Sequence, residues 1–265
     1  MIHHESAVRA AIARYSAVDG ARAVILGGSV ARGTERADSD VDLTLVVSDD
    51  AYTQYAASDR LSFVDHVPEF YDHAYFDVKV VTETILARAV EAADDPMRAS
   101  FVGARVLWTA AGLPLDALGE QLRAMAQPSE ATWREHEASF MAQARLHARY
   151  FLDQAEQLDL GLLRHHAAVH FAFAIGRALL ARNRVLFSGP KYLEVDLGRL
   201  GIAPVDVAPR LRRFLDAPTL AVAIELLSEV EDLGGWSPTQ EQTLSRFVED
   251  NELAWLTGRI PPEYR

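Results

Sequence analysis

The chain has 265 residues, of which 49% are hydrophobic and none is cysteine. This composition supports a packed core and excludes general disorder, a disulfide framework and a thiolate zinc site. No apolar run approaches the roughly 20 residues of a transmembrane helix, and the N-terminus lacks the pattern of a signal peptide, so we expect a soluble, cytoplasmic protein with no membrane partner. The formal net charge of −12 disfavours a nucleic-acid partner, because such partners bind basic surfaces. A negative cleft would instead attract a small cationic molecule.

Apolar periodicity predicts the first two elements of the chain. In residues 5–17 apolar side chains recur at helical spacing, so this segment is expected to form a helix. The apolar run over 24–26 predicts a strand, and it ends in Gly27, Gly28 and Ser29. Because glycine lets backbone N–H groups come close to an anion, this turn is a candidate phosphate-binding site.

Two aspartates stand at the start of the second predicted strand. Asp40 and Asp42 come directly before a mostly apolar run from Leu43 to Val47. Successive side chains of a strand point to opposite faces, so the two carboxylates share one face and the apolar side chains share the other. Adjacent carboxylates repel each other unless a cation lies between them, and Mg²⁺ binds carboxylate oxygens together with nucleotide phosphates. The pair is therefore a candidate metal site.

A third acid, Asp77, lies in a run of alternating side chains over 74–81. The alternation predicts a strand on which Asp77 and Lys79 share a face. A carboxylate on a neighbouring strand would complete a metal shell or take the proton from an attacking hydroxyl. The alternative is an Asp77–Lys79 pair on a solvated sheet face, and Lys79 could also keep Asp77 ionised or contact phosphate.

The other elements of the first half predict a small mixed β-sheet domain. The period changes after Gln127, Pro128 and Ser129, so we expect domains at 1–127 and 128–265. The further elements expected before this boundary are a short helix over 51–62, a helix over 82–93 with Thr82 as its N-cap, a strand over 105–108 and a helix over 115–126.

The second half is expected to be an all-α bundle, which makes the fold class α+β. The segment over 160–184 is apolar on more than one side and should lie at the centre of the bundle. A turn is expected over 187–193, and Trp133, Trp236 and Trp255 are expected to be packing residues. The helices are predicted over 129–158, 160–184, 206–216, 219–232 and 238–256.

Gly28-Ser29 followed by Asp40-Val41-Asp42 resembles the signature of the DNA polymerase β-like nucleotidyltransferase superfamily. The motif GSxARG…SDxDL is most similar to those of the minimal and the antibiotic-modifying branches of this superfamily. The resemblance implies that 1–127 is a catalytic domain in which one or two Mg²⁺ ions are held by Asp40, Asp42 and Asp77. It further implies that Gly28 and Ser29, together with the hydroxyl of Ser39, bind the nucleotide.

The run ARNRVLFSGPKYL resembles the helix end and lysine–aromatic turn of aminoglycoside and lincosamide nucleotidyltransferases. This resemblance implies that Lys191 binds the nucleotide phosphates, with Arg182 or Arg184 assisting. A surface lysine after a Gly-Pro turn is the alternative. By the same resemblance, 128–265 is a helical substrate-binding domain, and the acceptor binds in the cleft between the domains of a monomer or homodimer.

The function expected from these observations is Mg²⁺-dependent transfer of a nucleoside monophosphate from an NTP, with ATP expected, to a hydroxyl of a small acceptor. An aminoglycoside or lincosamide antibiotic is the expected kind of acceptor, and the role implied is antibiotic resistance. One alternative is nucleotidylation of a protein or RNA, as in toxin–antitoxin systems. Another is a catalytically silent nucleotide-binding module. Fold-level resemblance does not choose among acceptors.

Some acids and histidines of the helical half could contact the acceptor. Glu137 is an alternative to Asp77 as the general base. The histidines are interpreted as packing or acceptor-contact residues. A zinc site is disfavoured, because no third protein ligand lies at a spacing characteristic of zinc sites. The acids in question are Glu135, Glu137, Asp153 and Glu156, and the histidines are His165, His166 and His170.

Overall fold

The computed structural model describes residues 1–235, 238–258 and 260–262. The chain divides into two compact units, Met1–Pro128 and Ser129–Arg265. The first holds a five-stranded mixed sheet with helices, and the second is helical in the part that the structure describes. The predicted fold class, a small mixed sheet followed by a helical region, is confirmed.

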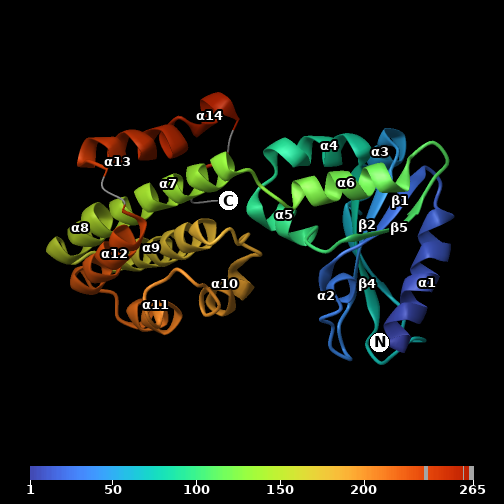
Figure 1. Ribbon diagram of the computed structural model, residues 1–265, viewed down its shortest axis with the longest axis horizontal. Helices are drawn as coiled ribbons and strands as arrows, with labels where there is room; N and C mark the ends of the chain where they lie inside the picture. Colours follow the sequence, from blue (N-terminus) through green and yellow to red (C-terminus); the bar gives the residue numbers. More distant parts are fainter. Residues whose placement is uncertain (236–237, 259, 263–265) are drawn as a thin grey trace. The chain divides into compact units, whose positions relative to one another are not determined.

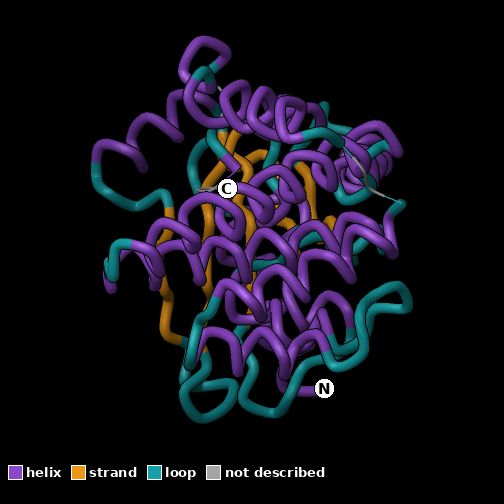
Figure 2. Tube along the Cα trace, turned by 90° about the vertical axis from the view of Figure 1, so that its left-hand side faces the viewer, coloured by secondary structure: helices purple, strands orange, loops and turns teal. Residues whose placement is uncertain are grey.

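The sheet of the first unit has the strand order β3-β4-β2-β1-β5. Of its neighbouring pairs, β2 and β4 run parallel and the other three run antiparallel. Figure 1 shows β2 and β4 side by side, and Figure 2 shows the strands of the sheet in orange. The strands are β1 (Ala21–Leu26), β2 (Val41–Val47), β3 (Ser62–His66), β4 (Tyr75–Thr82) and β5 (Arg105–Thr109).

Helices cover both faces of this sheet. Successive side chains of a strand point to opposite faces, and each face of the sheet carries buried apolar side chains. The helices α1 (Ile2–Ser16) and α3 (Asp49–Ala57) pack on one face, which Val41, Leu43 and Leu45 of β2 present. On the other face, α4 (Glu83–Ala92) and α6 (Leu115–Met125) cover Ile25 and Val46. That second face also carries the side chains of β2 and β4 that alternate with the core positions. Two short helices, α2 (Gly28–Arg32) and α5 (Asp95–Ser100), complete the unit.

The helix predicted over 51–62 extends too far. The helix α3 begins after Ser48, whose side chain accepts the N–H of Ala51, and it ends at Ala57. The edge strand β3 follows, and the sequence analysis missed it. Its burial alternates only between exposed and half-buried positions, so its sequence carries little hydrophobic contrast. The N-cap predicted at Thr82 is confirmed, since its side chain accepts the N–H of Ile85.

The second unit is built around α9 (Gly161–Arg182), whose buried residues recur on several sides. A long helical segment packs along it and includes a π-helical turn. Leu226 and Leu227 of α12 and Leu211 of α11 join the same core. The long segment consists of α7 (Glu130–Leu146), η1 (His147–Leu152) and α8 (Asp153–Gln157), and the two further helices are α11 (Val207–Asp216) and α12 (Leu220–Gly234).

Two expectations for the helical elements of the second unit are corrected. The turn predicted over 187–193 is wrong from Pro190 onward, because α10 (Pro190–Leu197) begins there, with proline in its first turn. The single helix predicted over 238–256 is interrupted by a π-helical turn and by Leu253. The elements in that segment are α13 (Gln240–Phe247), η2 (Val248–Glu252) and α14 (Ala254–Thr257).

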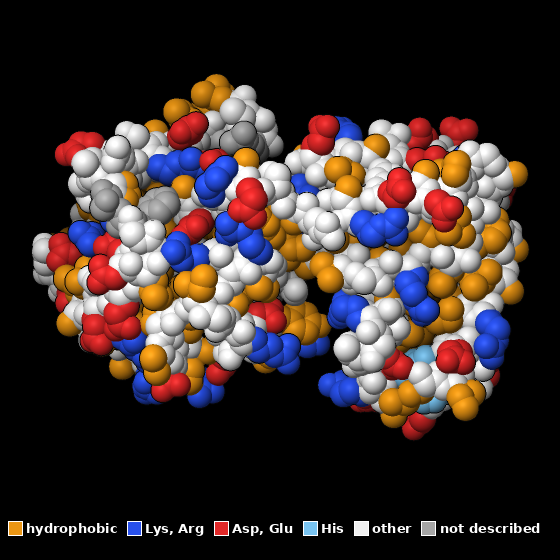
Figure 3. Space-filling model, viewed as in Figure 1, with side chains coloured by type: hydrophobic (Ala, Val, Ile, Leu, Met, Phe, Trp, Pro, Cys, Tyr) orange, Lys and Arg blue, Asp and Glu red, His pale blue; other side chains and the backbone are white. Residues whose placement is uncertain are grey.

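The predicted packing role of the tryptophans holds for one of them. Trp133 is buried, but Trp255 is 74% exposed because it lies on the short helix α14, which buries only Ala254. Trp236 lies outside the described residues. Among the helices that the structure describes, none has the length and apolarity needed to cross a membrane. Acidic and basic side chains are interspersed on the face shown in Figure 3.

Candidate active site

Three carboxylates converge at one end of the sheet. Asp42 on β2 lies directly opposite Asp77 on the parallel strand β4, and Asp40 immediately precedes β2. One carboxylate oxygen from each residue lies within 4.8 Å of those of the other two. Within the described residues this is the sole cluster of acidic and histidine side chains with such a geometry. All three side chains are half-buried, so they combine limited hydration with access from outside.

The electrostatics of this cluster fit a bound cation. Burial, followed by the charges of Asp40 and Asp77, raises the pKa of Asp42 to about 6. Lys79 and Arg32 act in the opposite direction but do not cancel this effect. Three mutually repelling oxygens at this spacing form a donor set that suits a hard divalent cation such as Mg²⁺. Asp40, Asp42 and Asp77 are therefore the residues that would hold it.

The turn after β1 brings the backbone against the cluster. Gly28 has a φ of +63°, and a Cβ atom added there would lie 1.7 Å from Oδ2 of Asp42. The N–H of the preceding Gly27 donates to the carbonyl of Asp42 at 2.9 Å, which fixes the turn to β2. Glycine at position 28 thus satisfies both the left-handed backbone and the close approach. Ser29 follows in the first turn of α2, where backbone N–H groups lack intrahelical partners.

Ser39 is tied into the loop that carries Asp40. Its hydroxyl accepts the N–H of Arg36 at 2.9 Å. Its carbonyl accepts the hydroxyl of Tyr71 at 2.7 Å and lies 3.0 Å from Nε2 of the fully buried His4. These contacts hold Ser39 in place directly before Asp40. The expected contact of the Ser39 hydroxyl with nucleotide stays a prediction.

Sequence reasoning missed the aromatic and imidazole groups beside the carboxylates. Burial raises the pKa of Tyr75, and both the charge of Asp40 and a hydrogen bond to it act in the same direction. Burial and Asp40 likewise raise the pKa of Tyr71. Tyr75 could have been found, because it precedes Asp77 by two positions on the same strand and so shares its face. His4 and Tyr71 gave no such signal, because they reach Ser39 only through tertiary folding.

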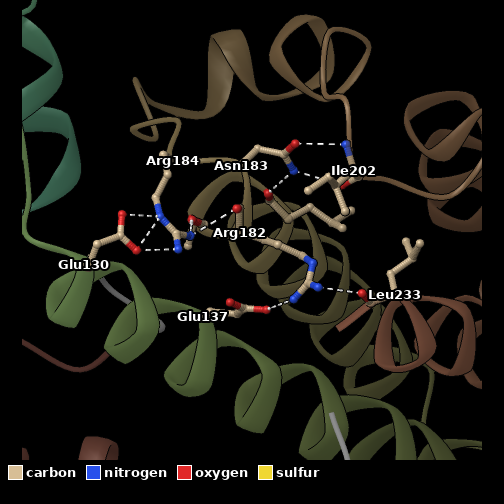
Figure 4. A network of polar contacts seen from close by, with 9 residues as sticks. Glu130, Glu137, Arg182, Asn183, Arg184, Ile202 and Leu233 are labelled. Carbon is tan, nitrogen blue, oxygen red and sulfur yellow. Dashed lines mark hydrogen bonds and ion pairs between the residues drawn. The ribbon is translucent and has the colours of Figure 1, made fainter. Parts of the chain in front are cut away.

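The other predicted nucleotide-binding residues, Lys191 and Arg182, belong to the second unit. Lys191 is exposed on α10, with its Nζ 5.4 Å from the ring centroid of Tyr192. Arg182 donates to Glu137 at 2.8 Å and to the carbonyl of Leu233 at 2.5 Å, as Figure 4 shows. In the same network Arg184 forms an ion pair with Glu130 at 2.6 Å. Both arginines are thus engaged in contacts that join helices of the second unit.

The acids considered for an acceptor pocket are also engaged in contacts. Glu137 is the partner of Arg182, and Glu135 is the partner of Arg246. Asp153 accepts from the side chain of Gln157, and Glu156 accepts the N–H of Leu220. These contacts give all four acids structural roles. Asp77 is the acid that lies beside Asp40 and Asp42.

Comparisons with known proteins agree with this geometry for the first unit. Residues 12–97 match the family model of the nucleotidyltransferase domain. No curated protein matches the chain. A crystal structure of a nucleotidyltransferase-like protein from Exiguobacterium sibiricum 255-15 is 16% identical, with a TM-score of 0.46 over 96% of this chain and 79% of that chain. The matched segment lies within the first unit and includes Gly28, Asp40, Asp42, Asp77 and the strands β2 and β4.

Proposed function

We propose that the chain is a nucleotidyltransferase that moves a nucleoside monophosphate from an NTP to a hydroxyl of a small acceptor. ATP is the proposed donor and Mg²⁺ the proposed cation. The observation that carries the proposal is that carboxylate oxygens of Asp40, Asp42 and Asp77 lie within 4.8 Å of one another, in a segment that matches the nucleotidyltransferase domain.

The residues of the chain have distinct parts in this reaction. Asp40, Asp42 and Asp77 hold one or two Mg²⁺ ions, which when bound neutralise charge on the phosphates. The turn at Gly28 and Ser29 presents backbone N–H groups to the phosphate tail. Asp77 orients the acceptor hydroxyl or accepts its proton. The acceptor oxygen forms a bond to the α-phosphorus, the bond from that phosphorus to the bridging oxygen breaks, and pyrophosphate leaves.

The proposed acceptor is an aminoglycoside or lincosamide, which would make the activity one of antibiotic resistance. Two features support this choice. The segment over 181–193 resembles the corresponding turn of enzymes that modify these antibiotics, and the net charge of −12 favours the approach of a cationic molecule. The nucleotidyltransferase match ends at residue 97, so the choice of acceptor rests on these two features alone.

The experiment that tests this function measures pyrophosphate release and product mass. The full chain is incubated with Mg²⁺, each of ATP, GTP, CTP and UTP, and a panel of aminoglycosides and lincosamides. We expect pyrophosphate release together with an acceptor whose mass has increased by one nucleoside monophosphate. Absence of both products across the panel, or an adduct on protein instead of the small molecule, would contradict the proposal.

A matched pair of variants isolates the carboxylate cluster. Asp42→Asn removes one charge from the cluster and should reduce turnover by on the order of 10³-fold or more. Asp38→Asn is the control, because Asp38 lies in the same loop, is exposed and pairs with Arg36. It should leave turnover near that of the unmodified chain. Near-normal turnover in Asp42→Asn would remove the metal assignment.

A further inference from the structure

The edge strand β3 borders the carboxylate cluster on the side away from the turn at Gly28. Across the sheet, Asp42 of β2 is followed by its partner Asp77 on β4 and then by Val64 on β3. Side chains of residues paired directly across a sheet are neighbours on the same face. The side chain of Val64 therefore lies beside Asp77 on the second face of the sheet, which carries the cluster.

This face of the sheet is open along β3. Val64 is 52% exposed, and Ser62 and His66, which share its face at a spacing of two residues, are exposed as well. The core cluster under α4 and α6 takes in residues of the other four strands but, within the described residues, none of β3. The three side chains span roughly 13 Å along the strand, which is enough for a molecule of one or two rings.

The direction of nucleotidyl transfer assigns this surface to the acceptor. In phosphoryl transfer the attacking and leaving oxygens lie roughly in line, on opposite sides of the phosphorus. In the proposed function the phosphate tail binds at the turn of Gly28 and Ser29, which contacts Asp42 from the side of β1. The acceptor hydroxyl then approaches from the side of Asp77, and the body of the acceptor extends over β3.

The charges around Val64 restrict the chemistry of the acceptor. Lys79 follows Asp77 by two positions on β4, so it shares the second face, and it is exposed. The acid of β3, Asp65, points to the opposite face, where it accepts the hydroxyl of Tyr15 at 2.9 Å. The carboxylates of the cluster are occupied by Mg²⁺ in the proposed function. An acceptor with several ammonium groups would thus meet a like charge and no carboxylate of β3.

We infer that the acceptor binds over β3 beside Asp77, and that it is a hydroxyl compound that carries an apolar group and at most one positive charge. Val64 contacts the apolar group, and Lys79 repels polycationic molecules. The inference rests on the proposed function and narrows its acceptor. The net charge of −12 attracts cations from a distance, whereas these two side chains act at contact distance and select among the molecules that arrive.

Lincomycin and kanamycin are the probes that test the choice of acceptor. Lincomycin combines a basic amine with an apolar propyl group, whereas kanamycin carries several ammonium groups. The full chain is incubated with ATP, Mg²⁺ and either compound, and kcat/KM is measured for each. We expect kcat/KM for lincomycin to exceed that for kanamycin at least about tenfold. Equal values, or a preference for kanamycin, would overturn the inference.

Val64→Thr tests the apolar contact. It replaces a methyl group by a hydroxyl and keeps a β-branched side chain, which suits a strand. We expect the KM for lincomycin to rise about three- to fivefold and the KM for ATP to stay the same. Val205→Thr is the matched control, because Val205 is an exposed valine of the second unit, and it should change neither KM. With folding of both variants verified by circular dichroism, an unchanged KM for lincomycin in Val64→Thr would contradict the contact.

Lys79→Gln tests the charge. It removes the ammonium group, so the preference for lincomycin over kanamycin, measured as the ratio of their kcat/KM values, should fall at least about threefold. The KM for ATP should stay the same. A higher KM for ATP with an unchanged ratio would mean that Lys79 contacts the nucleotide and would refute the selective role assigned to it.

Methyl NMR separates this inference from the proposed function. In the full chain with Mg²⁺ and a non-hydrolysable ATP analogue, lincomycin should shift the methyl signals of Val64 and leave those of Val205 in place. Nucleotidylated lincomycin without a shift at Val64 would retain the proposed function and overturn the subsite. A shift at Val64 without an adduct from any NTP would refute the transfer and retain the binding surface. Absence of both would refute both.

Discussion

The carboxylate cluster of the first unit differs from the ion pairs of the second unit. In the first, Asp40, Asp42 and Asp77 face one another, and burial raises the pKa of Asp42 to about 6. In the second, half-buried acids face arginines, as Glu231 faces Arg145 and Glu137 faces Arg182. Like charges held together destabilise a fold unless a ligand compensates them, whereas pairs of opposite charge join helices. The difference supports the proposed binding role of the carboxylate cluster, and it gives the paired acids of the second unit a structural explanation.

Among variants that keep all three carboxylates, Gly28→Ala should lower turnover the most. The added Cβ would overlap Oδ2 of Asp42, so the carboxylate must move and turnover should fall on the order of 10²-fold or more. Gly33→Ala is the matched control, because Gly33 also has a positive φ but nothing lies within 4 Å of its added Cβ. Both variants should lose about 1 kcal/mol of unfolding free energy through backbone strain. Steady-state kinetics and thermal unfolding measure the two effects, and equal turnover in the pair would contradict the role of the close approach.

Arg182→Met tests whether the charges of the second unit are structural. It leaves Glu137 half-buried without its ion-pair partner, so we expect a loss of about 1–3 kcal/mol in unfolding free energy. Replacing both residues in Glu137→Gln with Arg182→Met should recover part of that loss. If Arg182 instead binds nucleotide, the single variant will raise the KM for NTP with little change in stability. Chemical denaturation and a KM measurement on the same protein separate these results.

Asp42→Asn should stabilise the metal-free fold while it removes activity. The folded pKa of Asp42, about 6, is above its ordinary value of 3.8, so the wild-type protein loses stability as the pH rises from about 3.8 to about 6 and bears the full cost above that range. At pH 7.5 the variant should gain about 1–2 kcal/mol, after allowance for partial exposure. The gain should shrink as the pH falls from 7 towards 4, where the wild-type carboxyl is protonated in the folded protein. Thermal unfolding in EDTA across this range measures it, and a gain that does not depend on pH would contradict the raised pKa of Asp42.

Tyr71→Phe should have the smallest effect. It removes one of the two hydrogen bonds to the carbonyl before Asp40 and keeps the ring in place. We expect turnover to fall about three- to tenfold, with a higher concentration of Mg²⁺ needed for half-maximal rate. Tyr52→Phe is the control, since Tyr52 packs against the same core from α3. An unchanged Mg²⁺ dependence in Tyr71→Phe would mean that the hydrogen bond from Tyr71 to the carbonyl of Ser39 does not position the carboxylates.

Much of the candidate site could be read from local sequence, because local spacing decides it. The alternation of side chains predicted that Asp40 and Asp42 share one face. The glycines of the Gly27-Gly28-Ser29 turn predicted that the backbone comes close to another group. Local signals also located the cap at Thr82 and the helical period of the second half. The edge strand β3 was lost, because half-exposed positions carry too little hydrophobic contrast to reveal a strand.

What the tertiary structure decided is the pairing of distant segments. The parallel ladder of β2 and β4 sets Asp77 opposite Asp42, and the fold brings His4 and Tyr71 to the carbonyl of Ser39. The sequence by itself determined which residues could share a face, because side-chain direction repeats with the local backbone. It did not determine which faces meet, since register and helix packing depend on contacts between residues far apart in the chain.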